Sequence, residues 1–134
     1  MRVLVLLLVM CAGPPAQADD AARAKQNYQL NCMGCHAEDG KGLEGQVPSL
    51  HGTLSKISGA PQGRDYVLRV PGVTQSLLSP AEVAEVLNWA IVQFSDVEVA
   101  KRIQPFTAAE VAKARSRPLL EISTIRAKVL RETP

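Results

Sequence analysis

The sequence has no apolar run long enough for a membrane-spanning helix, which needs about 20 residues. Its longest run, residues 3–12, ends at Gly13, Pro14 and Pro15. A strong excess of basic charge is also missing, since 15 Lys and Arg stand against 13 Asp and Glu in 134 residues. A nucleic-acid partner would need a concentrated basic footprint. We therefore expect no permanent membrane anchor and no nucleic-acid partner, and the length allows about one domain.

The N-terminus has the order of an export signal. Arg2 precedes the apolar run, and the small-residue triplet Ala16-Gln17-Ala18 follows the prolines. A basic residue, a short apolar region and an A-x-A site are typical of a cleaved secretory signal peptide. We predict that residues 1–18 are removed. Cys11 is interpreted as an apolar signal residue, because a lipoprotein acceptor would follow a small side chain.

Charge is unevenly distributed along the rest of the chain. Residues 19–100 carry 6 basic and 10 acidic side chains, whereas residues 101–134 carry 8 basic and 3 acidic ones. No internal repeat or low-complexity segment is present. The pattern predicts a basic appendage on a mildly acidic body.

Two cysteines remain after the predicted cleavage, and a histidine follows them directly in Cys32-Met33-Gly34-Cys35-His36. A thioredoxin-like pair would follow a strand, yet no β-branched run precedes Cys32. A structural zinc site needs four ligands, and only His51 remains as a further candidate. A disulfide would close too short a loop to constrain the unfolded chain much. The fourth alternative, covalent haem attachment, has C-x-x-C-H as its signature.

We predict one covalently attached haem c at this motif. Two thiols on one helical turn can each add to a vinyl group, and His36 then supplies an imidazole nitrogen as the proximal ligand of the metal. Such attachment is completed outside the cytoplasm, in agreement with the export signal. No catalytic acid, base or nucleophile constellation accompanies the motif, so we predict that the protein is not an enzyme.

Further features extend beyond this pentapeptide. Tyr28 stands four residues before Cys32, residues 39–45 form a glycine-punctuated stretch, and residues 47–50 read Val-Pro-Ser-Leu. Together with the haem motif they resemble the class I c-type cytochromes, the monohaem cytochrome c family, over about residues 21–95. The resemblance implies an all-α domain wrapped around one haem.

The resemblance also implies roles for single residues. It makes the carbonyl of Pro48 the acceptor of a hydrogen bond from the proximal imidazole of His36, which fixes its tautomer and raises its basicity. It also implies that Trp89, on the C-terminal helix of the family, packs across the N-terminal helix near Tyr28.

The chain departs from the family at the second axial position of the iron. Class I members usually provide a methionine shortly before the C-terminal helix, but this chain has only Met1, Met10 and Met33. The first two lie in the predicted signal, and Met33 is tied between the two cysteines. Val70, before Pro71, stands where the resemblance places the methionine, and valine cannot ligate iron.

Two alternatives follow for this distal position. Another donor, such as His51, Lys56 or Gln75, fills it, or the position is open or holds water. We interpret His51 mainly as a structural histidine hydrogen-bonded to a neighbouring loop, and we favour the open position. Because methionine ligation raises the reduction potential, we expect a potential below that of an ordinary His–Met member.

Helices are predicted near residues 20–31, 79–94, 107–117 and 119–132. Ser79 with Glu82, and Thr107 with Glu110, form capping boxes that open the second and third of these. The stretch 59–66 is rich in glycine and proline and is predicted to be a loop.

Three side chains near this loop are candidates to hold the haem propionates: Arg64, Tyr66 and Arg69, since a guanidinium pairs well with a carboxylate. The alternative for each is a solvated surface position. The C-terminal segment either folds back along the haem domain, docks on an acidic partner surface, or serves only to increase solubility.

The predicted organisation is a signal peptide (1–18), a cytochrome c domain (19–98) and a basic helical extension (99–134). The predicted function is electron transfer in the periplasm by Fe3+/Fe2+ cycling, with redox partner proteins that include a dehydrogenase or an oxidase. One alternative is a haem protein that binds or senses a diatomic gas at an open distal site. Another is a haem subunit of a larger redox complex.

Overall fold

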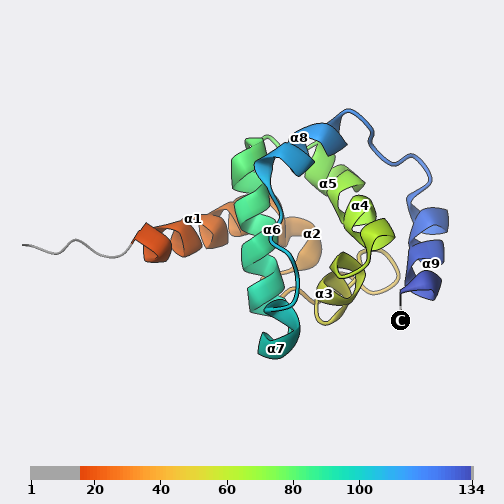
Figure 1. Ribbon diagram of the computed structural model, residues 1–134, viewed down its shortest axis with the longest axis horizontal. Helices are drawn as coiled ribbons and strands as arrows, with labels where there is room; N and C mark the ends of the chain where they lie inside the picture. The colour runs from red at the N-terminus through yellow and green to blue at the C-terminus, as the bar shows by residue number, and fades with distance from the viewer. Residues whose placement is uncertain (1–15, 134) are drawn as a thin grey trace, which may run out of the picture.

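The computed structural model describes residues 16–133, with side chains from residue 19 onward. Over this range the chain is helical (Figure 1): α1 Ala16–Asn31, α2 Met33–His36, α3 Thr53–Ser58, α4 Pro61–Arg69, α5 Pro71–Thr74, α6 Pro80–Phe94, α7 Val97–Ala100, α8 Ala108–Arg115 and α9 Ile122–Glu132. The all-α prediction is confirmed. None of these helices has the length and apolar character needed to cross a bilayer. Residues 1–15 of the predicted signal lie outside the described range.

Helices α1 and α6 cross and form the frame of the fold (Figure 1). At the crossing, the ring centroid of Tyr28 lies 5.1 Å from that of Trp89 and 5.4 Å from that of Phe94. Tilted aromatic contacts at such distances stabilise beyond simple burial. The predicted packing of Trp89 against Tyr28 is confirmed.

Helix α6 begins as predicted. The hydroxyl of Ser79 accepts from the N–H of Glu82, the Glu82 carboxylate accepts from the N–H of Ser79, and Pro80 occupies the first turn. The helix buries one apolar face: Val83, Ala84, Val86, Leu87, Ala90, Ile91 and Phe94. The helical spacing of these residues in the sequence therefore corresponds to the buried face of α6.

The predicted loop at residues 59–66 is wrong, because α4 begins at Pro61. Proline is tolerated in the first turn of a helix, where its missing N–H has no intrahelical partner. Gly63 serves close packing and does not interrupt the helix: a Cβ at this position would lie 2.0 Å from the carbonyl oxygen of Ile57. Pro61 and Gly63, two of the three residues that suggested a loop, are thus the ones that allow α4 to start and to pack on α3.

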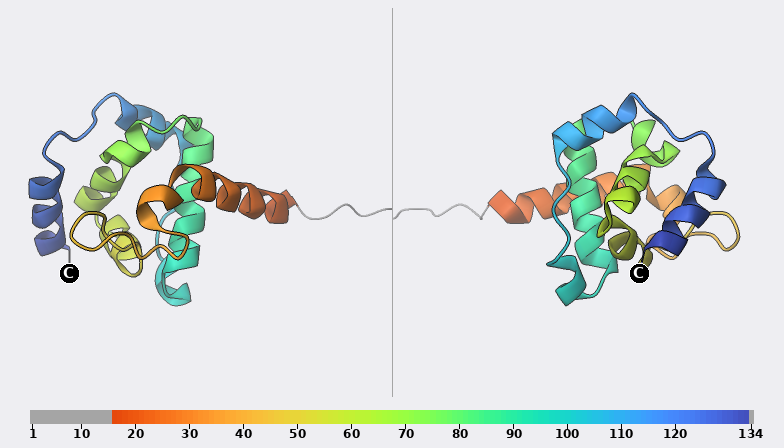
Figure 2. Two further views of the ribbon diagram at one scale, coloured as in Figure 1. Left: turned by 180° about the vertical axis from the view of Figure 1, so that it is seen from behind. Right: turned by 45° about the vertical axis from the view of Figure 1, so that its right-hand side comes forward.

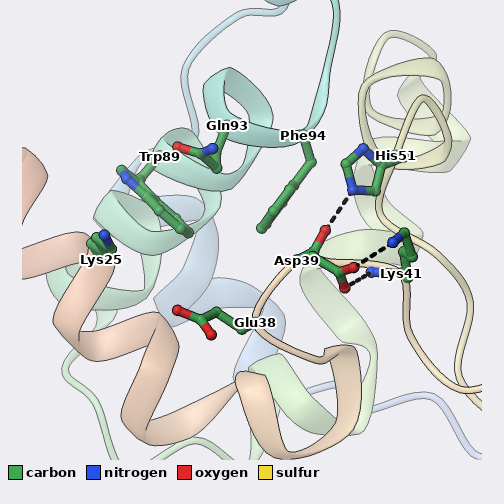
Figure 3. A pocket seen from close by; sticks show the side chains of 8 residues that line it. All are labelled: Lys25, Glu38, Asp39, Lys41, His51, Trp89, Gln93 and Phe94. Carbon is green, nitrogen blue, oxygen red and sulfur yellow. Dashed lines mark hydrogen bonds and ion pairs between the residues drawn. The ribbon is translucent and has the colours of Figure 1, made fainter.

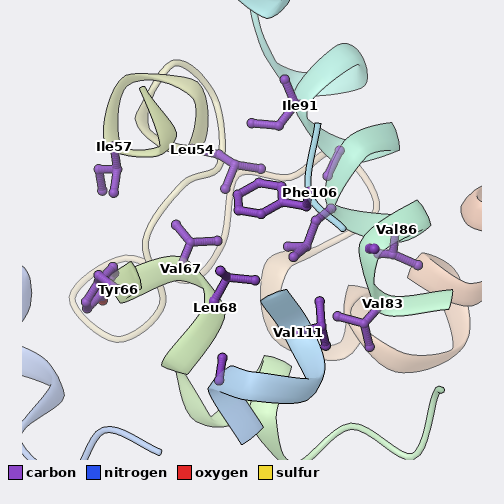
Figure 4. Packing of buried hydrophobic residues seen from close by; sticks show 14 of the residues in the cluster. Leu54, Ile57, Tyr66, Val67, Leu68, Val83, Val86, Ile91, Phe106 and Val111 are labelled. Atoms are coloured by element: carbon purple, nitrogen blue, oxygen red, sulfur yellow. The ribbon is translucent and has the colours of Figure 1, made fainter. Parts of the chain in front are cut away.

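The C-terminal segment folds back over the body of the molecule. Helix α8 packs on α4, α5 and α6, and α9 lies along α4 (Figure 2). Phe106 and Val111 point into the same core as the side chains of α4 and α6 (Figure 4). Asn88 of α6 exchanges two hydrogen bonds with the backbone of Phe106, at 3.0 and 2.7 Å. The haem domain and the predicted extension therefore share one hydrophobic core.

Candidate functional site

A cavity of about 350 Å³ lies between α2, the segment 46–50, and helices α3 to α6. Its size falls in the range of cofactor and ligand sites, and its walls are largely apolar, as such sites usually are. The four residues predicted to hold the haem all line it: Cys32, Cys35, His36 and Pro48. The cavity thus brings the residues of the haem motif together with residues of α3 to α6 that are distant in the sequence.

The short helix α2 places both thiols and the imidazole on one turn. The N–H groups of Cys35 and His36 both bond to the carbonyl of Cys32, at 3.2 and 3.0 Å. Cys35 is exposed and Cys32 is half-buried, and no disulfide joins them. Burial raises the pKa of the Cys32 thiol, and the neighbouring Cys35 adds to this. The arrangement fits two-point attachment to a planar group that enters the cavity.

His36 is half-buried, and burial lowers its pKa, while the backbone carbonyl of Pro48 opposes the shift in part. A lowered pKa favours the neutral imidazole, which is the form that binds metals. The Nδ1 atom is buried without a partner at full hydrogen-bond geometry. This orphaned donor beside Pro48 fits a ring whose Nδ1 faces that carbonyl and whose Nε2 is left for a metal.

The loop between α2 and α3 sets the position of Pro48. Gly42 has φ +73°, and its N–H donates to the carbonyl of His36 at 2.9 Å. A Cβ on Gly42 would lie 2.4 Å from the carbonyl oxygen of Val47 and 2.7 Å from that of Pro48. Only glycine combines this backbone conformation with such close approach. The predicted glycine-punctuated stretch thus holds Pro48 against the turn that carries His36.

His51 lies in a second cavity, of about 430 Å³, and does not line the first (Figure 3). Its Nε2 donates to the carbonyl of Asp39, and its ring meets that of Phe94 edge-on at 5.3 Å between centroids. These contacts agree with the structural interpretation of His51. The described residues contain no cluster of three or more His, Cys, Asp or Glu suited to a metal ion, so they offer no site of the zinc type.

The other two candidate distal donors also lie away from the first cavity. Lys56 and Gln75 are exposed and are not among the residues that line it. Met33 does not line it either.

The cavity wall formed by α4 and α5 is largely apolar. It consists of Tyr66, Val67, Val70 and the segment 71–73, and Ile122 of α9 adds to the lining. Helix α2 packs on α1 and makes no comparable contact with α4 or α5, so the cavity separates His36 from this wall. Val70 is both the C-cap residue of α4 and the N-cap residue of α5.

Two of the three candidate propionate partners have other roles. Arg64 binds the carboxylate of Glu110 at 2.7 and 3.0 Å and the carbonyls of Gln104 and Pro105. Neither it nor Arg69 lines the cavity, and only Tyr66 does. The interpretation of the two arginines as propionate partners is therefore corrected.

Arg69 is occupied in a similar way. Its guanidinium donates to the carboxylate of Asp65 at 2.8 Å and to the carbonyl of Arg117 at 2.6 Å. Both arginines are thus used where the C-terminal segment meets α4.

Sequence reasoning singled out Tyr66, Val70 and Pro71 of the α4–α5 wall but missed Val67 and Val73. Val67, Val70 and Val73 recur at intervals of three residues, which is the spacing of one helical face, and this signal was available. Ile122 carried no comparable signal, because only the return of α9 to α4 brings it to the cavity.

Comparison with known proteins places these features in a family. The family model for cytochrome c matches residues 21–69. A cytochrome c-552 of Thermus thermophilus is 32% identical over 136 residues, covering 88% of this chain and 88% of the relative. A second cytochrome c-552 of Thermus thermophilus is 33% identical over 121 residues, covering 77% and 88%. No solved structure gives a significant match.

These matches extend past the core of the haem domain. Residues 1–98 make up less than three quarters of the chain. A match over 88% or 77% of the chain therefore includes part of residues 99–134. The C-terminal segment is shared, at least in part, with both relatives.

Proposed function

This chain belongs to the cytochrome c family, and on that premise we propose that it is a periplasmic monohaem electron carrier serving a dehydrogenase or an oxidase. Family membership brings a covalently bound c-type haem and electron transfer. The observation that supports the assignment of residues is the single cavity lined by Cys32, Cys35, His36 and Pro48. The bound haem supplies one-electron chemistry, because its iron changes between the ferric and ferrous states.

The residues of the chain bind, orient and shield that group. Cys32 and Cys35 form the two thioether bonds, and the Nε2 atom of His36 is the proximal ligand. The carbonyl of Pro48 accepts from Nδ1 and fixes the imidazole tautomer. Apolar walls exclude water from the cavity, and such burial is one of the levers by which a protein sets the reduction potential.

Covalent attachment is tested with the full chain expressed together with a cytochrome c maturation system. Haem staining after denaturing electrophoresis is expected for the wild type, weaker for Cys32→Ser and for Cys35→Ser, and absent for the double variant. Cys11→Ser, within the predicted signal, is the matched control and is expected to stain like the wild type. A wild type that does not stain, or a double variant that does, contradicts the assignment.

Electron transfer and export are tested on the same preparation. The stained protein is expected to be reduced and reoxidised reversibly in a redox titration with a one-electron slope. It is expected in the periplasmic fraction, with Asp19 as the mature N-terminus by mass spectrometry. Retention of residues 1–18, or a cytoplasmic location, would contradict the proposed localisation.

The charge of the C-terminal segment supports a partner with an acidic surface. Lys113 and Arg131 are exposed and form no ion pair among the described residues. Charges at the rim of an interface act mainly on the association rate, and salt screens them. Once a partner is identified, its rate of electron exchange is expected to fall with ionic strength and with Lys113→Glu. Insensitivity to both would place the docking surface elsewhere.

A further inference from the structure

We propose that the iron position opposite His36 is left to an exogenous neutral diatomic ligand, of the carbon monoxide and nitric oxide class, with the hydroxyl of Tyr66 as hydrogen-bond donor to it. The inference rests on the haem site proposed above. It goes beyond electron transfer, because a carrier whose axial positions are both filled by protein has no place for such a ligand.

The wall formed by α4 and α5 is poor in donor atoms. Val67, Val70, Pro71 and Val73 carry no nitrogen, oxygen or sulfur in their side chains that could ligate iron. His51, the other histidine of the chain, is held by the carbonyl of Asp39 in the second cavity. Among the described residues of α4 and α5 that line the cavity, Tyr66 is thus the one whose side chain has a polar atom.

Hydrogen bonds fix the wall at the junction of α4 and α5. The N–H of Val70 donates to the carbonyl of Tyr66 at 3.2 Å. The carbonyl of Val70 accepts from the N–H groups of Val73 and Thr74, each at 3.0 Å, and from the Thr74 hydroxyl at 3.2 Å. This corner is therefore not free to turn a different side chain toward the iron.

The segment between α5 and α6, which precedes the C-terminal helix of the haem domain, is also held by hydrogen bonds. Arg115 of α8 donates to the carbonyls of Ser76 and Leu78, at 3.2 and 2.5 Å. The Ser76 hydroxyl accepts from the N–H of Leu78 at 3.2 Å. Gln75 is exposed on the outside of this pinned segment. The C-terminal segment thus pins the stretch next to Gln75, a candidate donor that does not line the cavity.

Tyr66 places a hydroxyl group in this wall. Its side chain is buried, with 7% exposure, and lines the cavity. Its hydroxyl forms no hydrogen bond with another described residue. Burial raises the pKa of this phenol, although Arg126 opposes the shift. The hydroxyl therefore keeps its proton and is able to donate, and distal donors of this kind are what stabilise a bound diatomic molecule.

The first experiment uses the full haem-loaded protein, after haem staining has established attachment, and carbon monoxide as the probe. We expect a high-spin ferrous spectrum that shifts on addition of carbon monoxide. Val70→Met places a thioether in the wall and is expected to give a low-spin spectrum with carbon monoxide affinity reduced at least tenfold. Val92→Met, which adds the same thioether at an exposed position of α6 that does not line the cavity, is expected to bind carbon monoxide like the wild type.

The second experiment tests the hydrogen bond from Tyr66. Tyr66→Phe is expected to release carbon monoxide about three- to tenfold faster, the change that loss of one hydrogen bond produces. The C–O stretching frequency is expected to rise in this variant. The wild-type frequency is expected to shift in heavy water, whereas that of Tyr66→Phe is not.

The outcomes separate the two proposals. A wild type without haem staining contradicts both the proposed function and this inference. A stained, low-spin ferrous protein indifferent to carbon monoxide leaves the electron carrier standing and overturns the open position. If Tyr66→Phe binds carbon monoxide with the same C–O stretching frequency as the wild type, the role of Tyr66 is overturned. The role is also overturned if the ferric spectrum of Tyr66→Phe differs from that of the wild type in a way that shows Tyr66 to be an iron ligand.

Discussion

The hydroxyl of Tyr28 donates a hydrogen bond to the carbonyl oxygen of Ala37 at 2.7 Å. Ala37 directly follows His36 and has φ 61° and ψ 167°, a backbone region that is almost confined to glycine. Tyr28 is itself fixed between Trp89 and Phe94. The aromatic cluster at the α1–α6 crossing therefore holds a strained residue in the turn that carries His36.

Removal of this hydroxyl is expected to weaken the turn. Tyr28→Phe leaves the carbonyl of Ala37 with only the longer hydrogen bond from the N–H of Gly40, at 3.3 Å, and loss of one hydrogen bond costs about 1 kcal/mol. The free energy of unfolding of the haem-loaded protein in urea measures the effect. Equal stability of the two proteins would show that the bond contributes nothing.

Ala37→Gly is expected to stabilise the protein. Glycine removes a strain of about 1–3 kcal/mol and loses roughly 0.5–1 kcal/mol through the greater freedom of the unfolded chain, so a net gain of about 1 kcal/mol follows. The urea midpoint should therefore rise. Ala22→Gly, at an exposed position within α1, is the matched control and should lower it. A fall of the midpoint in both variants would contradict the strain at Ala37.

Gly63→Ala is expected to be strongly destabilising. The added Cβ would lie 2.0 Å from the carbonyl oxygen of Ile57, so α3 and α4 would have to separate. A loss above about 3 kcal/mol is expected, together with reduced haem incorporation. Gly59→Ala, where a Cβ would have its nearest atom at an ordinary 3.5 Å and which does not line the cavity, is the control. Thermal unfolding and the ratio of haem to protein give both readouts, and a mild loss in Gly63→Ala would disprove the tight contact.

Glu110 is expected to contribute to acid sensitivity. The Arg64 guanidinium, and then the hydroxyl and N–H of Thr107, lower the pKa of its carboxyl from 4.5 to about 2. Because the folded state favours the charged form, this stabilisation is present above pH 4.5 and is lost as the pH falls toward 2. Glu110→Gln should therefore be less stable at neutral pH and lose less stability across that window.

The measurement is the free energy of unfolding as a function of pH. Glu44→Gln removes an exposed carboxylate that has no hydrogen bond or ion pair among the described residues, and it should follow the wild-type profile. Parallel profiles for Glu110→Gln and the wild type would show that the Arg64 contact does not depend on the charge of Glu110.

The reduction potential is expected to be lower than that of a protein with histidine and methionine as axial ligands. The matched comparison is Val70→Met, which differs from the wild type at one residue of the wall opposite His36. Spectroelectrochemical titration should give the higher potential for the variant. A wild-type potential equal to or above that of a low-spin Val70→Met protein would contradict this expectation.

Local sequence patterns predicted the parts of the fold that depend on local contacts. The capping boxes of Ser79 and Thr107 form between residues three positions apart, and both are present. The loop prediction at 59–66 failed because it depends on a contact that is not local. Gly63 is explained by its distance to Ile57, a contact between two helices that residue propensities do not describe.

The sequence by itself determined the haem motif, because two thiols and an imidazole within five residues come together on one helical turn. The absence of a suitable methionine also predicts a distal side that differs from the usual pattern. Only the tertiary structure decided which residues far from the motif line the cavity, since its wall joins α4 and α5 to Ile122 of α9. It likewise assigned Arg64 and Arg69 to the C-terminal segment. Contacts between residues some 40 to 50 positions apart depend on how the helices pack, and no local pattern records them.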